Sequence, residues 1–375
     1  MIKKYKSIMF LLSLTTLLTG CWDYNDVNKR SIILANGIDE TDDKIEFTGE
    51  IASLLSKNSS SGGKGQITDT YINVATGRYF EDARSAYNSH EPFESFLGAQ
   101  RAIVFSQKYA ERGIESYINR NYNAPEFRSS ALTAVSKESS REFFSGKIEN
   151  DISIGYAAED TIKYLSDTGA ALYKIIQEIN ADIQFGDIGY LLPYITKKEG
   201  TIEYIGMAAM KDSKLVGIID KKESDGFLFI LSKKATNIIP FPHPSNEKNL
   251  VSIKSKLKKR RVRTSYENNK VNIYLDLKLI SQIYYPYKIE MISKNDIKKL
   301  EEMVSRKVEH DVLKAIERSK NEFKCDVFAF GRYFKSQNMS TYRKINWKEE
   351  YLNAEFHINV TTKIKNTNLL DTKIK

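Results

Sequence analysis

The first half of the chain has short apolar runs that alternate with amphipathic segments. The strands predicted from these runs are residues 31–35, 45–52, 71–75, 101–105 and 127–135. The predicted helices are residues 79–88, 107–120 and 157–181. Turns are expected at Asn36-Gly37 and across residues 39–43, because Gly, Asn and Asp favour turn conformations. This succession of strands and helices predicts a layered α/β or α+β structure.

The pattern changes after a polar turn at residues 196–200. Short strands are predicted at residues 203–210, 215–219 and 227–231, and a proline-rich connector at residues 240–244. Apolar and polar positions then alternate over residues 251–257, 271–279 and 283–291. Such alternation is typical of antiparallel strands that bury one face.

One long amphipathic helix follows these strands. We expect it to open near Lys294, with Asn295 as its candidate N-cap. Its apolar residues recur every three or four positions and therefore lie on one face, which should pack on the sheet: Ile297, Leu300, Val304, Val308, Val312 and Ile316. Two last strands are predicted at residues 325–330 and 356–364. The predicted fold is α+β and multidomain, with a mixed sheet and helices in the N-terminal half. In the C-terminal half, a mainly antiparallel sheet is packed by the long helix.

The N-terminus has the pattern of a bacterial lipoprotein export signal. Three lysines precede the apolar residues 8–18, and the tetrapeptide Leu18-Thr19-Gly20-Cys21 forms a lipobox. Eleven residues at about 1.5 Å each are too short to cross a hydrocarbon core of about 30 Å. We therefore expect lipidation of Cys21, which becomes the first residue of the mature chain.

These observations divide the chain into three expected parts. Residues 1–20 form a signal peptide that is removed, residues 21–196 form an N-terminal α/β-type region with room for two subdomains, and residues 201–375 form a C-terminal α+β domain. The formal charge of +9 falls to about +6 when the three lysines of the signal are removed. This mild excess suits a protein at an anionic surface and gives no argument for nucleic acid as a partner.

The strongest charge feature is a basic run within the alternating strands. It places seven cations in ten positions: Lys254, Lys256, Lys258, Lys259, Arg260, Arg261 and Arg263. In a regular strand its even-numbered members would share one face. One interpretation is a site for anionic lipid headgroups, an anionic wall polymer or an acidic partner. The favoured interpretation is a solvated edge strand and hairpin tip that lysines protect from aggregation.

Residue patterns that would indicate catalysis are absent from the sequence. The four histidines do not have metal-ligand spacing, and Cys325 has no second cysteine to pair with once Cys21 carries lipid. The Ser/Gly-rich segment 57–65 lacks the spacing of a phosphate-binding loop and is interpreted as a surface linker. We therefore expect no enzyme activity, no metal and no cofactor.

Several short motifs, taken in order, resemble the Ger(x)C family of spore germination lipoproteins. The motifs are Cys21-Trp22-Asp23, Gly37-Ile38-Asp39, residues 76–83, residues 110–114, residues 206–217, and Asp326 to Gly331 with a downstream Trp347. The sequence departs from the family pattern in two places. Arg78-Tyr79 lies where the family motif has Thr, and Met210 stands where Phe is usual. The motifs extend over the mature chain.

The resemblance implies a function at the spore membrane. Family members are C subunits of nutrient germinant receptors on the outer leaflet of the spore inner membrane, where they act with membrane-embedded A and B subunits. The resemblance implies assembly and coupling through protein contacts, leaving open whether this subunit touches the germinant. The alternative is a solute-binding lipoprotein of an importer, which needs two similar lobes, and a cell-wall hydrolase is a third candidate.

Overall fold

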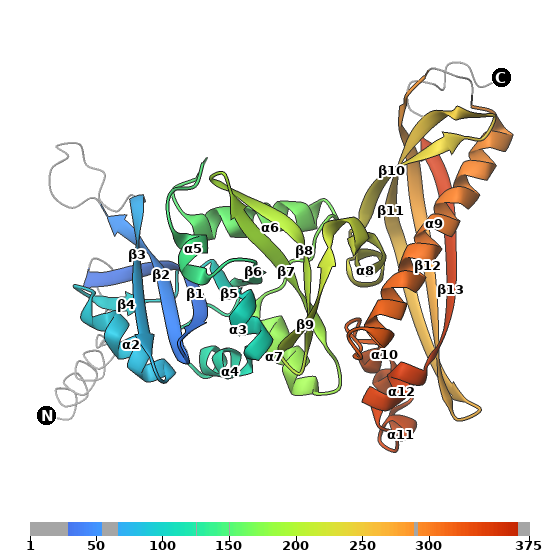
Figure 1. Ribbon diagram of the computed structural model, residues 1–375. Coiled ribbons are helices and arrows are strands. Elements are labelled where there is room, and N and C mark those ends of the chain that lie inside the picture. Colours follow the sequence, from blue (N-terminus) through green and yellow to red (C-terminus); the bar gives the residue numbers. More distant parts are fainter. Residues whose placement is uncertain (1–28, 55–66, 125, 150, 289–291, 367–375) are drawn as a thin grey trace, which may run out of the picture.

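The computed structural model describes residues 29–54, 67–124, 126–149, 151–288 and 292–366. The lipobox with Cys21 and the Ser/Gly-rich segment 57–65 lie outside the described residues. The chain forms two sheets with helices packed on them, one sheet in each half (Figure 1). The α+β, mixed-sheet architecture predicted from the sequence is confirmed.

The first sheet is mixed, with a parallel centre and antiparallel flanks. Its order is β3-β2-β1-β5-β6-β7-β8-β9, and the short β4 adds to β1. β1, β5, β6 and β7 run parallel, whereas β2, β3, β8 and β9 join through antiparallel hairpins. The strands are β1 Arg30–Thr41, β2 Lys44–Leu54, β3 Ile67–Gly77, β4 Glu94–Phe96, β5 Ala102–Ser106, β6 Leu132–Ser136, β7 Tyr190–Lys198, β8 Thr201–Lys211 and β9 Lys214–Asp220.

Helices cover both faces of this first sheet. On one face α5 and α6 pack against Val104 and Ala134, and on the other α3 and α4 pack against Ile103 and Phe105. Since neighbouring residues of β5 face opposite cores, all five residues of that strand are buried. The helices are α2 Phe80–Ser89, α3 Gln107–Arg112, α4 Glu115–Asn123, α5 Ser140–Phe144, α6 Ile154–Asp167 and α7 Ile176–Phe185.

Two buried carboxylates tie helices to this sheet. Asp39 of β1 accepts hydrogen bonds from Ser106 Oγ at 2.5 Å and from the Ser140 amide at 3.0 Å, which joins β1 to the end of β5 and the start of α5. Glu50 of β2 accepts from the amides of Ile154 and Gly155 at the start of α6, and burial raises its pKa. Both acids satisfy amides at helix starts, where backbone donors lack intrahelical partners.

The second sheet has four strands and a helix on one face. Its order is β10-β11-β12-β13, and β13 runs parallel to β12 whereas the other pairs are antiparallel. The long α9 lies along the sheet (Figure 1), and the predicted stripe from Leu300 to Ile316 is buried against it. The elements are α8 Ser224–Leu231, β10 Thr236–His243, β11 Asn246–Glu267, β12 Lys270–Pro286, α9 Lys294–Asn321, α10 Phe330–Gln337, α11 Met339–Tyr342, α12 Trp347–Asn353 and β13 Glu355–Asn366.

The junction between the two halves is packed and polar. One apolar core cluster contains residues of both sheets, and α8 lies between the sheets in Figure 1. Several side chains of the second half bond directly to the first, and Lys348 also pairs with Asp212 at 2.8 Å. Arg318 donates to the Ile218 carbonyl at 3.1 Å, Arg332 to Asp182 at 2.8 Å, and Tyr342 to Asp187 at 2.6 Å.

Two predicted helices are each divided in the structure. The predicted helix 157–181 is two helices, α6 and α7, because the chain turns at Gly169 with φ of 84°. A Cβ there would lie 1.9 Å from the Lys234 carbonyl oxygen, so only glycine allows this close approach. The predicted helix 107–120 is likewise divided into α3 and α4 at Gly113.

Two predicted strands and one turn are wrong. Residues 227–231 belong to helix α8, and residues 325–330 form a turn that leads into α10. Both are short, mostly apolar runs that are largely buried, and periodicity alone does not determine the structure of such runs. β1 continues through Asn36-Gly37, and the turn lies at Asp42-Asp43, where φ is positive.

Several element boundaries in the second half also differ from the prediction. Ser293 caps α9 in place of Asn295, because its Oγ accepts from the Asp296 amide at 3.1 Å. Residues 270–286 form one strand where two were predicted, and residues 240–243 of the predicted connector belong to β10. The polar turn at 199–200 joins β7 to β8 within the first sheet, and the change of sheet follows β9.

Candidate functional site

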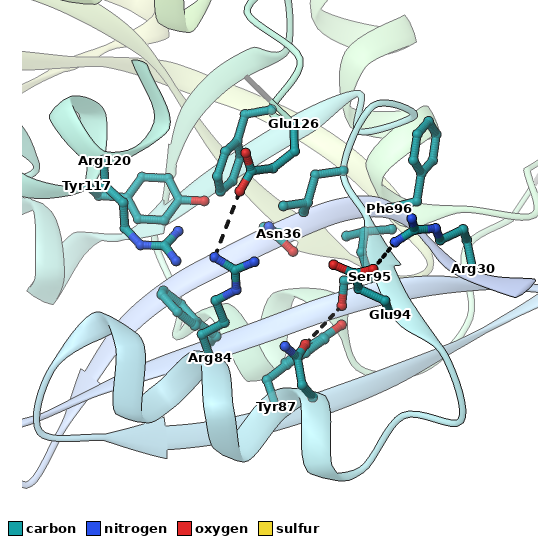
Figure 2. Close-up of a pocket in the computed structure, with 15 residues that line it drawn as sticks. Arg30, Asn36, Arg84, Tyr87, Glu94, Ser95, Phe96, Tyr117, Arg120 and Glu126 are labelled. Carbon is teal, nitrogen blue, oxygen red and sulfur yellow. Dashed lines mark hydrogen bonds and ion pairs between the residues drawn. The ribbon is translucent and has the colours of Figure 1, made fainter. Parts of the chain in front are cut away.

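A cavity of about 460 Å³ lies in the first half, between β1, β2, β4, α2 and α4. Figure 2 shows its lining side chains, which come from all five elements and from the loop after α4. The volume falls within the usual range for small-molecule sites. None of its residues was singled out as a site by the sequence, because they are spread over residues 30–127 and form no contiguous motif.

The walls of the cavity are largely apolar and aromatic. Ile33 and Phe47 come from the sheet, Leu97 from the segment after β4, and Tyr117 from α4. The Phe47 and Tyr117 rings meet edge to face with centroids 6.1 Å apart. Burial raises the pKa of Tyr117 to about 12, although Asn36 hydrogen-bonds to it, so the phenol remains protonated at neutral pH.

Three arginines surround this apolar space, and they differ in how they are held. Arg30, at the start of β1, pairs with Glu94, since β4 runs parallel to β1 and places the two residues opposite each other. Arg120 donates from Nε and Nη2 to one oxygen of Glu81, at 3.2 and 3.0 Å. Its guanidinium also lies 5.6 Å from the centroid of the Phe127 ring.

Arg84 is the least satisfied of the three arginines. Its nearest carboxylate is Glu126 Oε1 at 3.8 Å, too far for a hydrogen bond. In Figure 2 the Arg84 side chain rises from α2 towards Glu126, with the Arg120 guanidinium beside it. Two cationic groups therefore border the same part of the cavity, one held by an acid and the other paired only loosely.

The apolar lining and the loosely paired Arg84 make this cavity suited to binding a ligand. Among the described residues, no three His, Cys, Asp or Glu side chains are grouped to hold a metal ion. Tyr87 lines the cavity, but burial raises the pKa of its phenol, which makes it a poor base at neutral pH. The neighbouring acids are engaged in other contacts, since Glu94 pairs with Arg30 and Glu91 accepts from Tyr71 and Asn73.

The basic run lies on β11, and a β-bulge interrupts its alternation. The register shifts between Leu257 and Lys259, so Arg260 turns to the α9 side and donates to the Ile230 carbonyl. The expectation that even-numbered members share one face is therefore wrong beyond Lys258. Lys254, Lys256, Lys259, Arg261 and Arg263 pair with β12 residues on the face opposite α9.

We call Lys254, Lys256, Lys259, Arg261 and Lys278 of β12 the cationic face. Within the described part of the chain, none of these five cations has a carboxylate partner, whereas Arg263 pairs with Asp276 at 3.3 Å. Lys254 lies 5.6 Å from the Tyr284 ring centroid. β10 pairs with β11 only as far as Lys256, so residues 258–267 form an edge without a strand partner. Gln337 and Asn338 at the end of α10 bond to the backbone of this edge at Val262 and Thr264.

The motif from Asp326 to Gly331 forms a tight loop at the junction of the two halves. The Asp326 carboxylate accepts from the Gly331 amide at 2.7 Å and from the Trp347 indole at 3.2 Å. A Cβ at position 331 would lie 2.7 Å from that indole nitrogen, which explains the glycine. Burial raises the pKa of Asp326 to about 6. Burial likewise raises the pKa of neighbouring Cys325 to about 12, so that thiol stays protonated and unreactive.

No helix within the described ranges is long and apolar enough to cross a membrane.

Comparison with known proteins identifies relatives along the whole chain. Spore germination protein B3 of Bacillus subtilis (strain 168) is 21% identical, with 96% of each chain covered. Spore germination protein GerQC of Bacillus cereus is 22% identical, with 95% of this chain and 97% of that protein covered. The fold is similar to the crystal structure of the GerBC protein, with a TM-score of 0.54 at 17% identity over 88% of this chain and 97% of that one. None of these names is that of an enzyme.

Two family models match consecutive parts of the chain. The spore germination protein N-terminal domain matches residues 23–197, and the spore germination B3/GerAC-like C-terminal model matches residues 205–368. Together they cover nearly all of the sequence that follows the lipobox. The chain therefore belongs to the family of GerAC-like spore germination proteins.

Proposed function

We propose that this chain is the lipid-anchored C subunit of a nutrient germinant receptor in the spore inner membrane. It assembles with membrane-embedded A and B subunits and helps to couple nutrient sensing to germination. The observation that carries the proposal is similarity over almost the full length to several spore germination proteins. Protein contacts with those subunits are the proposed mode of action.

The proposed anchor would hold the first sheet close to the membrane. Cys21 precedes Arg30, the first residue of β1, by nine positions. Nine residues reach at most about 30 Å when fully extended. More than one acyl chain on the cysteine gives stable attachment, whereas one chain gives only marginal binding. Since Arg30 also lines the cavity, that cavity would lie near the anchored end of the molecule.

Deletion of the gene in spores tests the proposal. Spores without the protein should lose their response to particular nutrients and still germinate with a chemical trigger that needs no receptor. Restoring the wild-type gene should restore the response. A normal response to every nutrient in the deleted strain, with no paralogous gene to substitute, would contradict the assignment.

A Cys21→Ala variant tests the anchor separately from the receptor assignment. We expect the protein to leave the membrane fraction and the nutrient response to weaken. A variant that stays on the inner membrane and works normally would show that contacts with the other subunits suffice, since a second attachment can retain a protein that has lost its first.

The alternative, a solute-binding lipoprotein of an importer, has less support. That class closes two similar lobes around its ligand, whereas the two sheets here differ in strand number and connection. The cavity also lies inside the first half and not between the halves. Loss of uptake of one solute, with normal germination, would favour the importer over the receptor.

Contact with an anionic surface remains a proposal for the cationic face. Its support is the lack of carboxylate partners among the described residues. Cosedimentation with vesicles of neutral lipid, with and without anionic phosphatidylglycerol, provides the test. Charge reversal at Lys256, Lys259 and Arg261 should abolish any dependence on the anionic lipid. Equal sedimentation of wild type and variant would favour protection of the strand edge as the role of these residues.

A further inference from the structure

The cavity in the first half combines an apolar floor with unsatisfied cationic donors. Ligand sites are typically lined by apolar and aromatic side chains, with a few polar groups that orient the ligand. Here Ile33, Phe47 and Leu97 provide apolar surface, and the guanidiniums of Arg84 and Arg120 provide the polar groups. The exposed side chains of Arg84 and Glu126 leave this end of the cavity open to solvent.

The donors of these two arginines determine what the cavity can recognise. A guanidinium carries five N–H donors in a fixed planar fork. Arg84 makes no hydrogen bond with any described residue, and Arg120 uses Nε and Nη2 but not Nη1. Arginine donors match carboxylates in geometry and bind them more strongly than neutral acceptors. Because Arg84 and Nη1 of Arg120 keep donors that no described acid occupies, the cavity favours an anion over a neutral or cationic ligand.

We propose that this cavity binds a small amphipathic carboxylate. The ligand's carboxylate is held by Arg84, with Nη1 of Arg120 as a second donor, and its apolar part packs against Phe47, Ile33 and Leu97. Glu126, 3.8 Å from Arg84, competes with the ligand for that arginine. This inference goes beyond the receptor assignment and does not depend on it.

The test measures binding of 3-phenylpropanoate, which has a carboxylate and an apolar ring. The matched probe is 3-phenylpropanamide, which keeps the shape and loses the charge. The full lipidated chain in nanodiscs of neutral lipid is titrated by calorimetry and by saturation-transfer NMR. We expect saturable binding of the carboxylate in the millimolar range or tighter, and binding of the amide at least tenfold weaker.

Two substitutions of opposite effect distinguish the proposed site from nonspecific binding. Arg84→Gln should weaken carboxylate binding about tenfold and leave amide binding unchanged. Glu126→Gln should tighten carboxylate binding severalfold, because it removes the competing acid. Arg306→Gln is the matched control, since this exposed arginine lies on α9 and its nearest acid is 3.9 Å away.

A third substitution tests the location of the site without changing charge. Leu97→Trp fills the cavity and should abolish binding of both probes, while thermal unfolding reports whether the variant still folds. Nonsaturable binding, equal affinities for the two probes, or an unchanged carboxylate affinity in Arg84→Gln would each overturn the proposal. None of these outcomes bears on whether spores require the protein to respond to nutrients.

Discussion

The two sheets of this protein use their faces in opposite ways. The first carries helices on both faces, so its central strand β5 is buried at every position. The second carries α9 on one face and leaves the other to solvent, so buried and accessible residues alternate along much of β12. Burial on both faces produces continuous apolar runs, whereas burial on one face produces alternation. The cavity belongs to the first arrangement and the cationic face to the second.

Substitutions at adjacent positions provide the strongest test of this difference. In β12, Leu277→Ala should lower the free energy of unfolding by about 2–5 kcal/mol, and Lys278→Ala should change it by less than about 0.5 kcal/mol. In β5, Ile103→Ala should cost about 2–5 kcal/mol, and Val104→Ala on the opposite face about 1–3 kcal/mol. Both β5 residues and Leu277 are buried, whereas Lys278 is exposed. Urea unfolding of the four variants measures these effects.

A large effect at Lys278, or none at Val104, would contradict the assignment of one covered face to the second sheet and two to the first.

The junction should show a pH dependence that originates from Asp326. Its folded pKa of about 6 lies above the ordinary value for an aspartate, so folding favours the protonated form. The resulting stabilisation is complete below the unfolded pKa of about 4 and is lost as the pH rises through about 6. Wild-type stability relative to Asp326→Asn should therefore fall by roughly 2–3 kcal/mol between pH 4 and pH 7. Urea unfolding at a series of pH values checks this.

Because other carboxylates titrate in both proteins, the difference between wild type and variant is the quantity to compare. A difference that does not vary with pH would show that Asp326 keeps an ordinary pKa.

The buried acids of the first sheet should matter more than its exposed acids. Asp39→Ala removes the acceptor for Ser106 Oγ and the Ser140 amide, and leaves that buried amide unpaired. We expect a loss of about 1–3 kcal/mol. Asp69→Ala on β3 is the control, since the one hydrogen bond of this exposed side chain to a described residue is from the neighbouring Thr70 amide, and it should cost less than about 0.5 kcal/mol. Equal losses of stability in the two variants, measured by thermal unfolding, would contradict the greater importance of the buried acid.

The smallest effect on stability is expected at the edge of β11. Lys259→Val with Arg261→Val should change stability by less than about 0.5 kcal/mol, because both side chains are exposed. If these cations protect the edge, the double variant should associate with increasing concentration in light scattering. Lys278→Val is the control, because β12 is paired on both sides. If the Lys278→Val control associates to the same extent, the general loss of charge causes the association, and protection of the edge does not.

The contrast between the sheets also explains what could be predicted from the sequence. The α9 stripe and the alternation within β11 and β12 were predicted, because one solvated face leaves a periodic signal, although β11 extends beyond residues 251–257 and β12 is one strand where two were predicted. Residues 227–231 were predicted wrongly, because a run buried on all sides carries no period. The break at Gly169 depends on the distant Lys234 carbonyl, which a local pattern cannot reveal. The cavity combines Arg30, Arg84 and Arg120 from three elements, and no spacing rule connects them.

The bonded junction has a mechanical consequence. Arg318 bonds to the Ile218 carbonyl, Arg332 and Tyr342 bond near the end of α7 at Asp182 and Asp187, and Lys348 pairs with Asp212 between β8 and β9. Attachments at several points resist rotation that a single flexible connection would allow. The two halves should therefore move as one rigid body, so that a rotation of the first sheet also displaces the tip of the β11–β12 hairpin.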